Sequence, residues 1–464
     1  MAKEIGQKLY GLIPSQQTMY IMVKYSIHKQ VIQIPSAVIV NDKLDFDLLK
    51  KALGIEFERN DALRLRFTKV DDEIKQYFLP TYSNNNVPVL SFKTKQEEDA
   101  YFEKDAQKPI KFLKDETFRI VFYRTHDSKT GIYFNVSHLV TDALGQAVFF
   151  ADLLSVYKAL KNGDELPKPL HSYEEHIQRE FQYLANDKLH GKDRDFYINY
   201  WKKDGEPFYA GVHGPNLLEK ARKKDPNIRV PKVFDPIHDK TKIIRRYVSP
   251  EDTNKIYDYC KKELVIPENV FLYGLRAHAS KVNYRAPDVL NMLICSRRAV
   301  VKDKMMGGCV AQPLQIRVIT NETDTFREAV NKVADCRNQL IRHMNFPYLE
   351  ARYLQQQEFG YTANQGPSCL MFSWMPLGFA IKESNFDVEF KAYTNGRFSM
   401  QLYIFAVPDA KTGGTDFYYM YRPHTISAEQ INLLHDNAMK AINEGIENPD
   451  ITVGELLDDL DDIK

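Results

Sequence analysis

Apolar and polar residues alternate with a period of two just before residue 138, and the period then becomes that of a helix. The run 132–137 predicts a strand with one buried face, which delivers His138 where the chain leaves the sheet. Over 144–157 apolar residues recur at intervals of three and four, which predicts an amphipathic helix capped by Thr141 or Asp142. We therefore expect a strand, a sharp turn and a helix N-terminus.

The same patterns predict interleaved helices and strands in both halves of the chain, a mixed α/β fold. In the first half we expect a helix over 45–57, a strand over 62–68, and a hairpin of 118–123 with 131–138. In the second half we expect helices over 268–282 and from about 250, 326 and 427, and strands over 289–296, 313–319, 368–374, 398–407 and 416–421.

The Gly- and Pro-containing segment 161–169 is the best candidate for a domain boundary. We expect two domains on this basis, 1–165 and 166–464. The segment 202–242 is polar, basic and interrupted by Pro and Gly, so we expect surface loops there, and we expect the acidic end 458–462 to be solvated.

Composition limits the function classes. The formal net charge of +1 over 464 residues gives no bulk electrostatic case for binding nucleic acid or an anionic membrane. The first eight residues lack a signal-peptide pattern, and no apolar run approaches the roughly 18 residues of a membrane span. Five cysteines, an odd number set mostly in apolar segments, indicate reduced thiols and a cytoplasmic protein: Cys260, Cys295, Cys309, Cys336 and Cys369.

The predicted turn at His138 suits acyl transfer. A histidine titrates near neutral pH, so it can accept a proton from an attacking amine or hydroxyl. Backbone N–H groups at a helix N-terminus, such as that of Ala143, can face the oxyanion of a tetrahedral intermediate. An ordinary strand-end histidine followed by an ordinary helix cap gives the same local pattern, so the motif alone leaves both interpretations open.

Five segments in a fixed order carry more information than that motif. They are IPSQQTMY at 13–20, RNDALRLRF at 59–67, SHLVTDA at 137–143, Arg298 followed by GCVAQPLQIR at 308–317, and HMNFPYLE at 343–350. Together they resemble the condensation-domain superfamily of nonribosomal peptide synthetases, relatives of chloramphenicol acetyltransferase and of the BAHD acyltransferases, whose signature is HHxxxDG. The resemblance covers nearly the whole chain.

The resemblance implies two chloramphenicol-acetyltransferase-like subdomains arranged as a V, with a central tunnel that crossover segments of the second subdomain cover. It implies a thioester donor, carried on coenzyme A or on the phosphopantetheine of a carrier protein, and an amine or hydroxyl acceptor. His138 would act as base or positioning group. Asp142 would be structural and pair with Arg298, and the backbone N–H of Ala143 would bind the oxyanion.

This chain departs from the family pattern at three positions. Ser137 replaces the first histidine of the signature, Ala143 the glycine, and Gln312 the family asparagine. We expect Ser137, Gln312 and Ser373 to contact substrate, although a strand serine bonded to backbone explains Ser373 equally well, and a structural role is as open for Gln312. Cys309 is expected to be an inert core thiol, because no paired base is identifiable near it in the sequence.

Three hypotheses follow. The chain is a free-standing acyltransferase, a catalytically silent relative that binds a carrier protein or partner, or a scaffold that resembles the family only in its core. Retention of His138, Asp142 and Arg298 favours the first. We expect a stand-alone protein, because no adenylation or carrier sequence is present. Metal and nucleotide-binding motifs are absent from the sequence, so we expect neither a metal nor a tightly bound cofactor.

Overall fold

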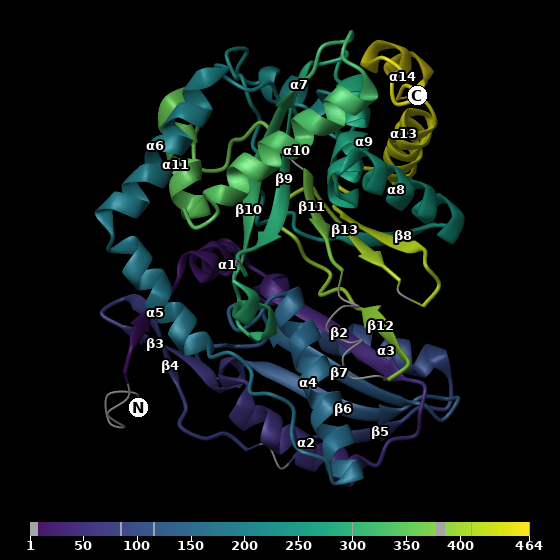
Figure 1. The fold of residues 1–464 in the computed structure, drawn as a ribbon. Helices are drawn as coiled ribbons and strands as arrows, with labels where there is room; N and C mark the ends of the chain where they lie inside the picture. The colour runs from purple at the N-terminus through teal and green to yellow at the C-terminus, as the bar shows by residue number, and fades with distance from the viewer. Residues whose placement is uncertain are drawn as a thin grey trace. The chain divides into compact units, whose positions relative to one another are not determined.

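The computed structural model describes residues 8–83, 86–114, 117–298, 300–368, 370–376, 386–409 and 411–463. The chain forms two compact units (Figure 1). The first comprises Met1–Asn186, Ser296–Ala311 and Pro376–Arg397, and the second comprises Asp187–Cys295, Gln312–Met375 and Phe398–Lys464.

The first unit is built on a five-stranded sheet of order β12-β2-β7-β6-β5 (Figure 1). Its strands are β2 (Gln33–Val40), β5 (Val89–Ser91), β6 (Phe118–Arg124), β7 (Thr130–Ser137) and β12 (Val388–Ala392). The helices are α1 (Pro14–Tyr25), α2 (Phe46–Arg59), α3 (Lys95–Ala106), α4 (Ala143–Asn162) and α5 (Tyr173–Leu184). A smaller sheet of order β1-β4-β3 joins β1 (Tyr10–Gly11), β3 (Leu65–Val70) and β4 (Glu73–Phe78).

Strand β7 is buried on both faces, so the prediction of one buried face was wrong. Its alternation is nevertheless as expected, because Phe134 packs on Phe149 of α4 with ring centroids 4.3 Å apart. On the opposite face Tyr133 stacks on Phe102 of α3, also at 4.3 Å. The polar residue Asn135 is tolerated there because its side-chain amide donates to Asp105.

The second unit is built on a six-stranded sheet of order β10-β9-β11-β13-β14-β8. Its strands are β8 (Lys242–Val248), β9 (Asp288–Ser296), β10 (Ala311–Ile319), β11 (Leu370–Trp374), β13 (Leu402–Pro408) and β14 (Thr415–Tyr421). The helices are α6 (Asp187–Lys203), α7 (Asn216–Arg222), α8 (Pro250–Glu263), α9 (Pro267–Val282), α10 (Phe326–Arg342), α11 (Tyr348–Phe359), α13 (Ala428–Glu447) and α14 (Val453–Asp459). Helix α9 packs on the sheet through Phe271, whose ring lies 4.9 Å from that of Phe417.

The first unit continues beyond residue 165, where the Gly- and Pro-containing segment suggested a boundary. Gly163 ends α4 in the left-handed conformation, with φ of 72°, as a C-terminal glycine does. The chain then returns to the same core, because Tyr173 and Ile177 of α5 are fully buried in it. A break in secondary structure is therefore not the limit of this compact unit.

The expectation of surface loops over 202–242 was wrong, whereas the acidic end is exposed as expected. The segment 202–242 contains α7 and contributes buried residues to the core, among them Tyr209, Val212 and Val230. At the acidic end, Asp458, Asp459, Asp461 and Asp462 are all exposed, and Asp458 remains 69% exposed although it forms an ion pair with Arg285 at 2.5 Å. In both segments, scattered apolar or charged residues find partners that are distant in sequence.

Helix α4 is long and apolar enough to cross a membrane by length and composition, with a mean hydropathy of 1.3 over its most apolar window. Of that window, 72% is buried inside the protein. Core helices pass the same test, and α4 packs against β7 as such a helix does.

Candidate acyl-transfer site

The turn between β7 and α4 holds His138. The backbone N–H of His138 donates to the Ile32 carbonyl at 2.7 Å, and that of Val140 donates to the Ser137 carbonyl at 2.9 Å. Helix α4 begins at Ala143 with Asp142 as its cap, whose carboxylate accepts from the Gly145 N–H at 2.9 Å. The predicted strand, turn and helix N-terminus are therefore present, and the cap is Asp142 rather than Thr141.

The carboxylate of Asp142 is fully engaged in holding this turn. One oxygen caps α4, and the other accepts from Arg298 at 2.8 Å and from the backbone N–H of Val310 at 2.9 Å. Burial raises the pKa of Asp142, but the Arg298 charge and these hydrogen bonds outweigh it and hold the pKa below its ordinary value. A carboxylate so occupied is suited to a structural role and not to proton transfer.

Arg298 connects the turn at His138 to the loop that follows Arg298 in sequence. Besides Asp142, its guanidinium donates to the carbonyls of Met306 at 3.1 Å and Gly308 at 2.7 Å. The neighbouring Arg297 has different partners, Glu180 at 2.9 Å and the Ser15 hydroxyl at 3.1 Å. The two adjacent arginines are therefore not interchangeable, and Arg298 is the one that contacts Asp142.

Other family-like segments support the turn without any chemistry of their own. The amide of Gln16 donates to the Leu139 carbonyl at 2.9 Å. Arg59 forms a two-point ion pair with Asp152 of α4, at 2.7 and 2.9 Å. Asp61 accepts from the backbone N–H groups of Tyr173 and Glu174, so it satisfies the start of α5. These contacts give the segments 13–20 and 59–67 a structural role in the same unit as the histidine motif.

The imidazole of His138 is half-buried, and its Nδ1 lies 3.5 Å from the Sγ of Cys309. Burial lowers the pKa of His138, while the charge of Asp142 and a hydrogen bond to its own backbone raise it, with burial the largest effect. His138 is therefore neutral at neutral pH, as a proton acceptor must be. The expectation that Cys309 has no base nearby was wrong, because the two residues lie 171 positions apart in sequence.

The backbone N–H of Ala143 is the first of helix α4. First-turn N–H groups have no acceptor within their own helix, and the cap residue Asp142 serves the Gly145 N–H instead. The positive end of the helix dipole adds to the attraction for an anion at this position. An oxyanion role for Ala143 stays a prediction.

The three residues expected to contact substrate are each bonded within the protein. Ser137 is 1% exposed, and its hydroxyl accepts weakly from the Leu139 N–H at 3.4 Å. In the second unit, the Gln312 amide donates to the carbonyls of Met344 and Phe346, and the Ser373 hydroxyl bonds that of Tyr403 at 2.9 Å. Their contacts with substrate stay predictions.

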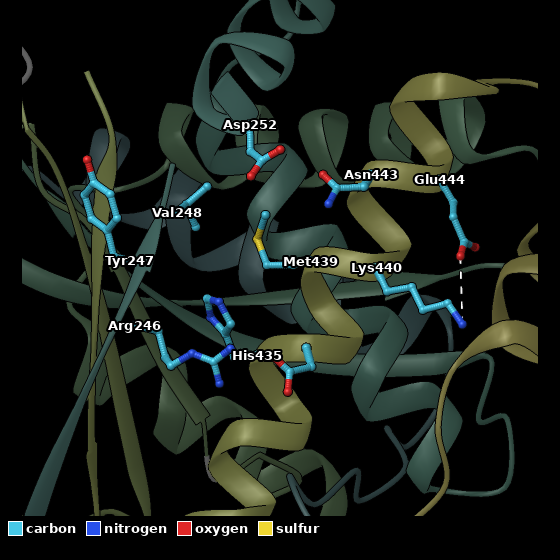
Figure 2. A pocket seen from close by; sticks show the side chains of 10 residues that line it. Arg246, Tyr247, Val248, Asp252, His435, Met439, Lys440, Asn443 and Glu444 are labelled. Atoms are coloured by element: carbon cyan, nitrogen blue, oxygen red, sulfur yellow. Dashed lines mark hydrogen bonds and ion pairs between the residues drawn. The ribbon is translucent and has the colours of Figure 1, made fainter. Parts of the chain in front are cut away.

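Two further features bear on what the protein can bind. A cavity of about 430 Å³ in the second unit lies between β8, α8 and α13 (Figure 2). Its charged groups already form pairs, such as Arg246 with Asp436 and Lys440 with Glu444, and none of the predicted site residues line it. Among the described residues, no group of three His, Cys, Asp or Glu side chains is arranged to hold a metal ion.

Histidines elsewhere in the chain can be structural, as His278 illustrates. It lies in α9, is 1% exposed, and bonds the Val212 carbonyl and the Asn437 amide. Burial lowers the pKa of His278 to about 4. Four of the five cysteines lie within the described residues and are thiols rather than disulfides, and Cys369 lies outside the described residues.

Known proteins resemble this chain in sequence. The chain is 20% identical over 461 residues to surfactin synthase subunit 1 of Bacillus subtilis (strain 168), covering 96% of this chain but 12% of that protein. It is 24% identical over 210 residues to gramicidin S synthase 2 of Brevibacillus brevis, covering 43% of this chain and 4% of that protein. The chain thus spans a small part of the curated relatives it matches.

Solved structures show the same fold. The first condensation domain of the calcium-dependent antibiotic synthetase, in complex with a substrate analogue, superimposes with a TM-score of 0.78 at 16% identity, covering 97% of this chain and 98% of that one. The starter condensation domain of rhizomide synthetase, a mutant in complex with C8-CoA, gives 0.80 at 15% identity over 98% of both chains. The X-domain from teicoplanin biosynthesis gives 0.75 at 14% identity over 97% of both.

The family model of the condensation domain matches residues 6–405. That match spans most of the chain and includes the turn with His138, Asp142 and Arg298. This chain belongs to the condensation-domain family.

Proposed function

We propose that this protein is an acyltransferase that moves an acyl group from a thioester to an amine or hydroxyl acceptor. The donor is an acyl thioester of coenzyme A or of a carrier-protein phosphopantetheine. The observation that carries the proposal is the His138 turn, where a neutral imidazole stands beside a helix N-terminus fixed by the Asp142–Arg298 pair.

In the proposed reaction the acceptor nitrogen or oxygen attacks the thioester carbonyl carbon. A new C–N or C–O bond forms, the C–S bond breaks, and His138 takes the proton of the acceptor and returns it to the leaving thiolate. With an amine acceptor, positioning by His138 supplies much of the rate even without full proton transfer. The N–H of Ala143 stabilises the tetrahedral oxyanion.

The donor class has support from the family. A starter condensation domain of the same fold was solved with C8-CoA, and the curated relatives are peptide synthetases. Because the chain covers 12% of the length of surfactin synthase subunit 1, the synthetase's whole activity is not carried over. A carrier-protein partner, a free-standing protein and a cytoplasmic location stay predictions.

A catalytically silent, partner-binding protein is the second candidate. Two observations favour it: Ser137 and Ala143 replace the first histidine and the glycine of the family signature, and an X-domain of the same fold was solved in complex with OxyB from teicoplanin biosynthesis. The intact Asp142–Arg298 pair favours the enzyme, although the pair is structural by itself.

The test is thiol release from a panel of acyl-coenzyme A, acyl-pantetheine and acyl-carrier thioesters, with and without pooled amines and alcohols. We expect acceptor-dependent release that falls by about 100-fold or more in His138→Ala. His126→Ala, which changes an exposed histidine in the turn between β6 and β7, is the matched control and should keep full activity. Equal release by wild type and His138→Ala on every donor would favour the partner-binding protein.

A further inference from the structure

The backbone that carries Cys309 is fixed at three consecutive residues. The Gly308 carbonyl accepts from Arg298 at 2.7 Å, and the Cys309 carbonyl accepts from the Tyr173 hydroxyl at 2.9 Å. The Val310 N–H donates to Asp142 at 2.9 Å. The Cys309 side chain is fully buried, so its position against His138 is set by the fold.

The loop that precedes Cys309 lies close against Tyr173 and Asn60. A Cβ on Gly308 would lie 1.9 Å from the ring of Tyr173, and a Cβ on Gly307 would lie 2.1 Å from the side-chain oxygen of Asn60. These distances are far below any ordinary contact, so the loop follows α2 and α5 more closely than a residue with a side chain would allow. Close packing at Gly307 and Gly308 thus adds to the hydrogen bonds that hold the backbone of Cys309.

The protonation states restrict what the contact can be. Burial raises the pKa of the Cys309 thiol, and the charge of Asp142 raises it further. Burial lowers the pKa of His138. At neutral pH the thiol is therefore protonated and the imidazole carries a single proton, so the contact is either S–H to Nδ1 or Nδ1–H to sulfur.

We propose that Cys309 is a positioning residue whose sulfur accepts a hydrogen bond from Nδ1–H of His138 and so leaves Nε2 unprotonated. The nitrogen that lies 3.5 Å from Cys309 is Nδ1. A hydrogen bond from the ring to the backbone of His138 raises the pKa of His138, and Nδ1 is the ring nitrogen close enough to the backbone to reach the carbonyl of its own residue, which favours this direction. A carbonyl only accepts, so a ring nitrogen that bonds it must carry the proton. Sulfur is a weak acceptor, and its hydrogen bonds are longer than those of oxygen, so a nitrogen–sulfur distance of 3.5 Å is ordinary.

This inference deepens the proposed function, since an unprotonated Nε2 is the atom that would take the acceptor's proton. Its test needs no acyl substrate. The protein is labelled with ¹⁵N-histidine, and the ring nitrogens of its 12 histidines are recorded by NMR at neutral pH. The spectrum of His138→Gln identifies the His138 signals.

We expect His138 of the wild type to show a protonated Nδ1 and an unprotonated Nε2. Cys309→Ala, which removes the sulfur and leaves the His138 carbonyl as the remaining acceptor for Nδ1–H, should change the tautomer ratio about fivefold toward Nε2–H, the equilibrium effect of one net hydrogen bond. Cys309→Ser returns an acceptor to the same place and should restore the wild-type ratio. Cys260→Ala, which removes a buried thiol of the second unit, is the control and should leave His138 unchanged.

A wild-type Nε2–H tautomer would overturn the proposal, because the thiol would then be the donor. A ratio unaffected by Cys309→Ala would overturn it as well. Should Cys309→Ala not fold, the wild-type tautomer and the Cys309→Ser spectrum still decide the direction of the bond. These results are independent of acyl transfer, so an inactive wild type with the expected tautomer would refute the proposed function and leave the contact established.

Discussion

The two units each contain a buried Arg–Asp pair, and the pairs differ in what they hold. In the first unit Arg298 donates to Asp142 at 2.8 Å, and in the second unit Arg317 binds both oxygens of Asp288, the shorter distance being 2.6 Å. All four side chains are at most 5% exposed. Both pairs are therefore buried and hydrogen-bonded, although Arg317 contacts both carboxylate oxygens and Arg298 contacts one.

Their surroundings are not equivalent. Asp142 also caps α4, and Arg298 also binds the carbonyls beside Cys309, so this pair fixes the loop and the helix end on either side of His138. Arg317 instead binds the carbonyls of Asp204 and Gly205 and joins strand β10 to the start of β9. The two pairs therefore differ in the segments that they fix, and the segments fixed by Asp142 and Arg298 are those on either side of His138.

The largest expected effect separates the two pairs. Asp142→Ala leaves the Arg298 charge buried and unpaired, and Asp288→Ala does the same to Arg317, so each should lower the free energy of unfolding by about 3–5 kcal/mol. Only Asp142→Ala should also abolish acceptor-dependent thiol release at a temperature where both variants remain folded. Denaturant unfolding and the release assay measure the two effects.

Equal activity losses in these two variants would contradict the distinction, because the loss would then follow stability alone. Full activity in Asp142→Ala would also contradict it. The folded fraction of each variant at the assay temperature is the necessary control.

A smaller loss of stability is expected from a substitution at Gly308, in the loop whose carbonyls Arg298 binds. Gly308→Ala places a Cβ against the buried ring of Tyr173, so we expect a loss of about 1–3 kcal/mol and a lower rate of acyl transfer. Gly54→Ala is the matched substitution, since Gly54 is exposed in α2 and a Cβ there meets nothing within 4 Å. Gly54→Ala should stabilise the protein by about 0.5–1 kcal/mol. Denaturant unfolding curves of the two variants should therefore show changes in the free energy of unfolding of opposite sign.

The contribution of Asp142 to the free energy of unfolding should depend on pH, and this effect is expected to be smaller than those above. The folded-state pKa of Asp142 lies below its ordinary value of 3.8, so its contribution to stability is present above that value and is lost as the pH falls through the folded pKa. The difference in unfolding free energy between wild type and Asp142→Asn should therefore narrow as the pH falls below about 5. A difference that stays constant to pH 3 would contradict this assignment.

The activity of His138 should depend on pH in a related way. Because burial places the pKa of His138 below its ordinary value of 6.5, the acid limb of kcat/KM should have its midpoint below pH 6.5. A midpoint above 6.5 would indicate that the working histidine is more solvated or more strongly paired than this structure has it.

The local parts of the site could be predicted from the sequence. The change of period at residue 138 and the cap at Asp142 are properties of adjacent residues, and β7, its turn and α4 follow them. The capping box of Thr325 and Glu328 likewise marks the start of α10, as the structure confirms. Helix α5 was missed although Ser172, which caps it, and the two acids after Tyr173 were a readable signal.

The parts that join distant segments could not be derived from the pattern. The pairing of Asp142 with Arg298 spans 156 residues and was expected only from the family resemblance. The contact of His138 with Cys309 had no signal at all, because periodicity places a cysteine in a core but says nothing of its neighbour. Both faces of β7 are buried for a similar reason, since α3 covers the polar face from a distant part of the chain.

The measurement that tests the central claim most directly is the rate of amide or ester product formation from an acyl thioester by wild type and by His138→Ala, with the product identified by mass spectrometry. The account predicts a product that requires both donor and acceptor, and a rate in His138→Ala lower by about 100-fold or more, with the protein still folded. A folded His138→Ala variant that forms the product at the wild-type rate would contradict it.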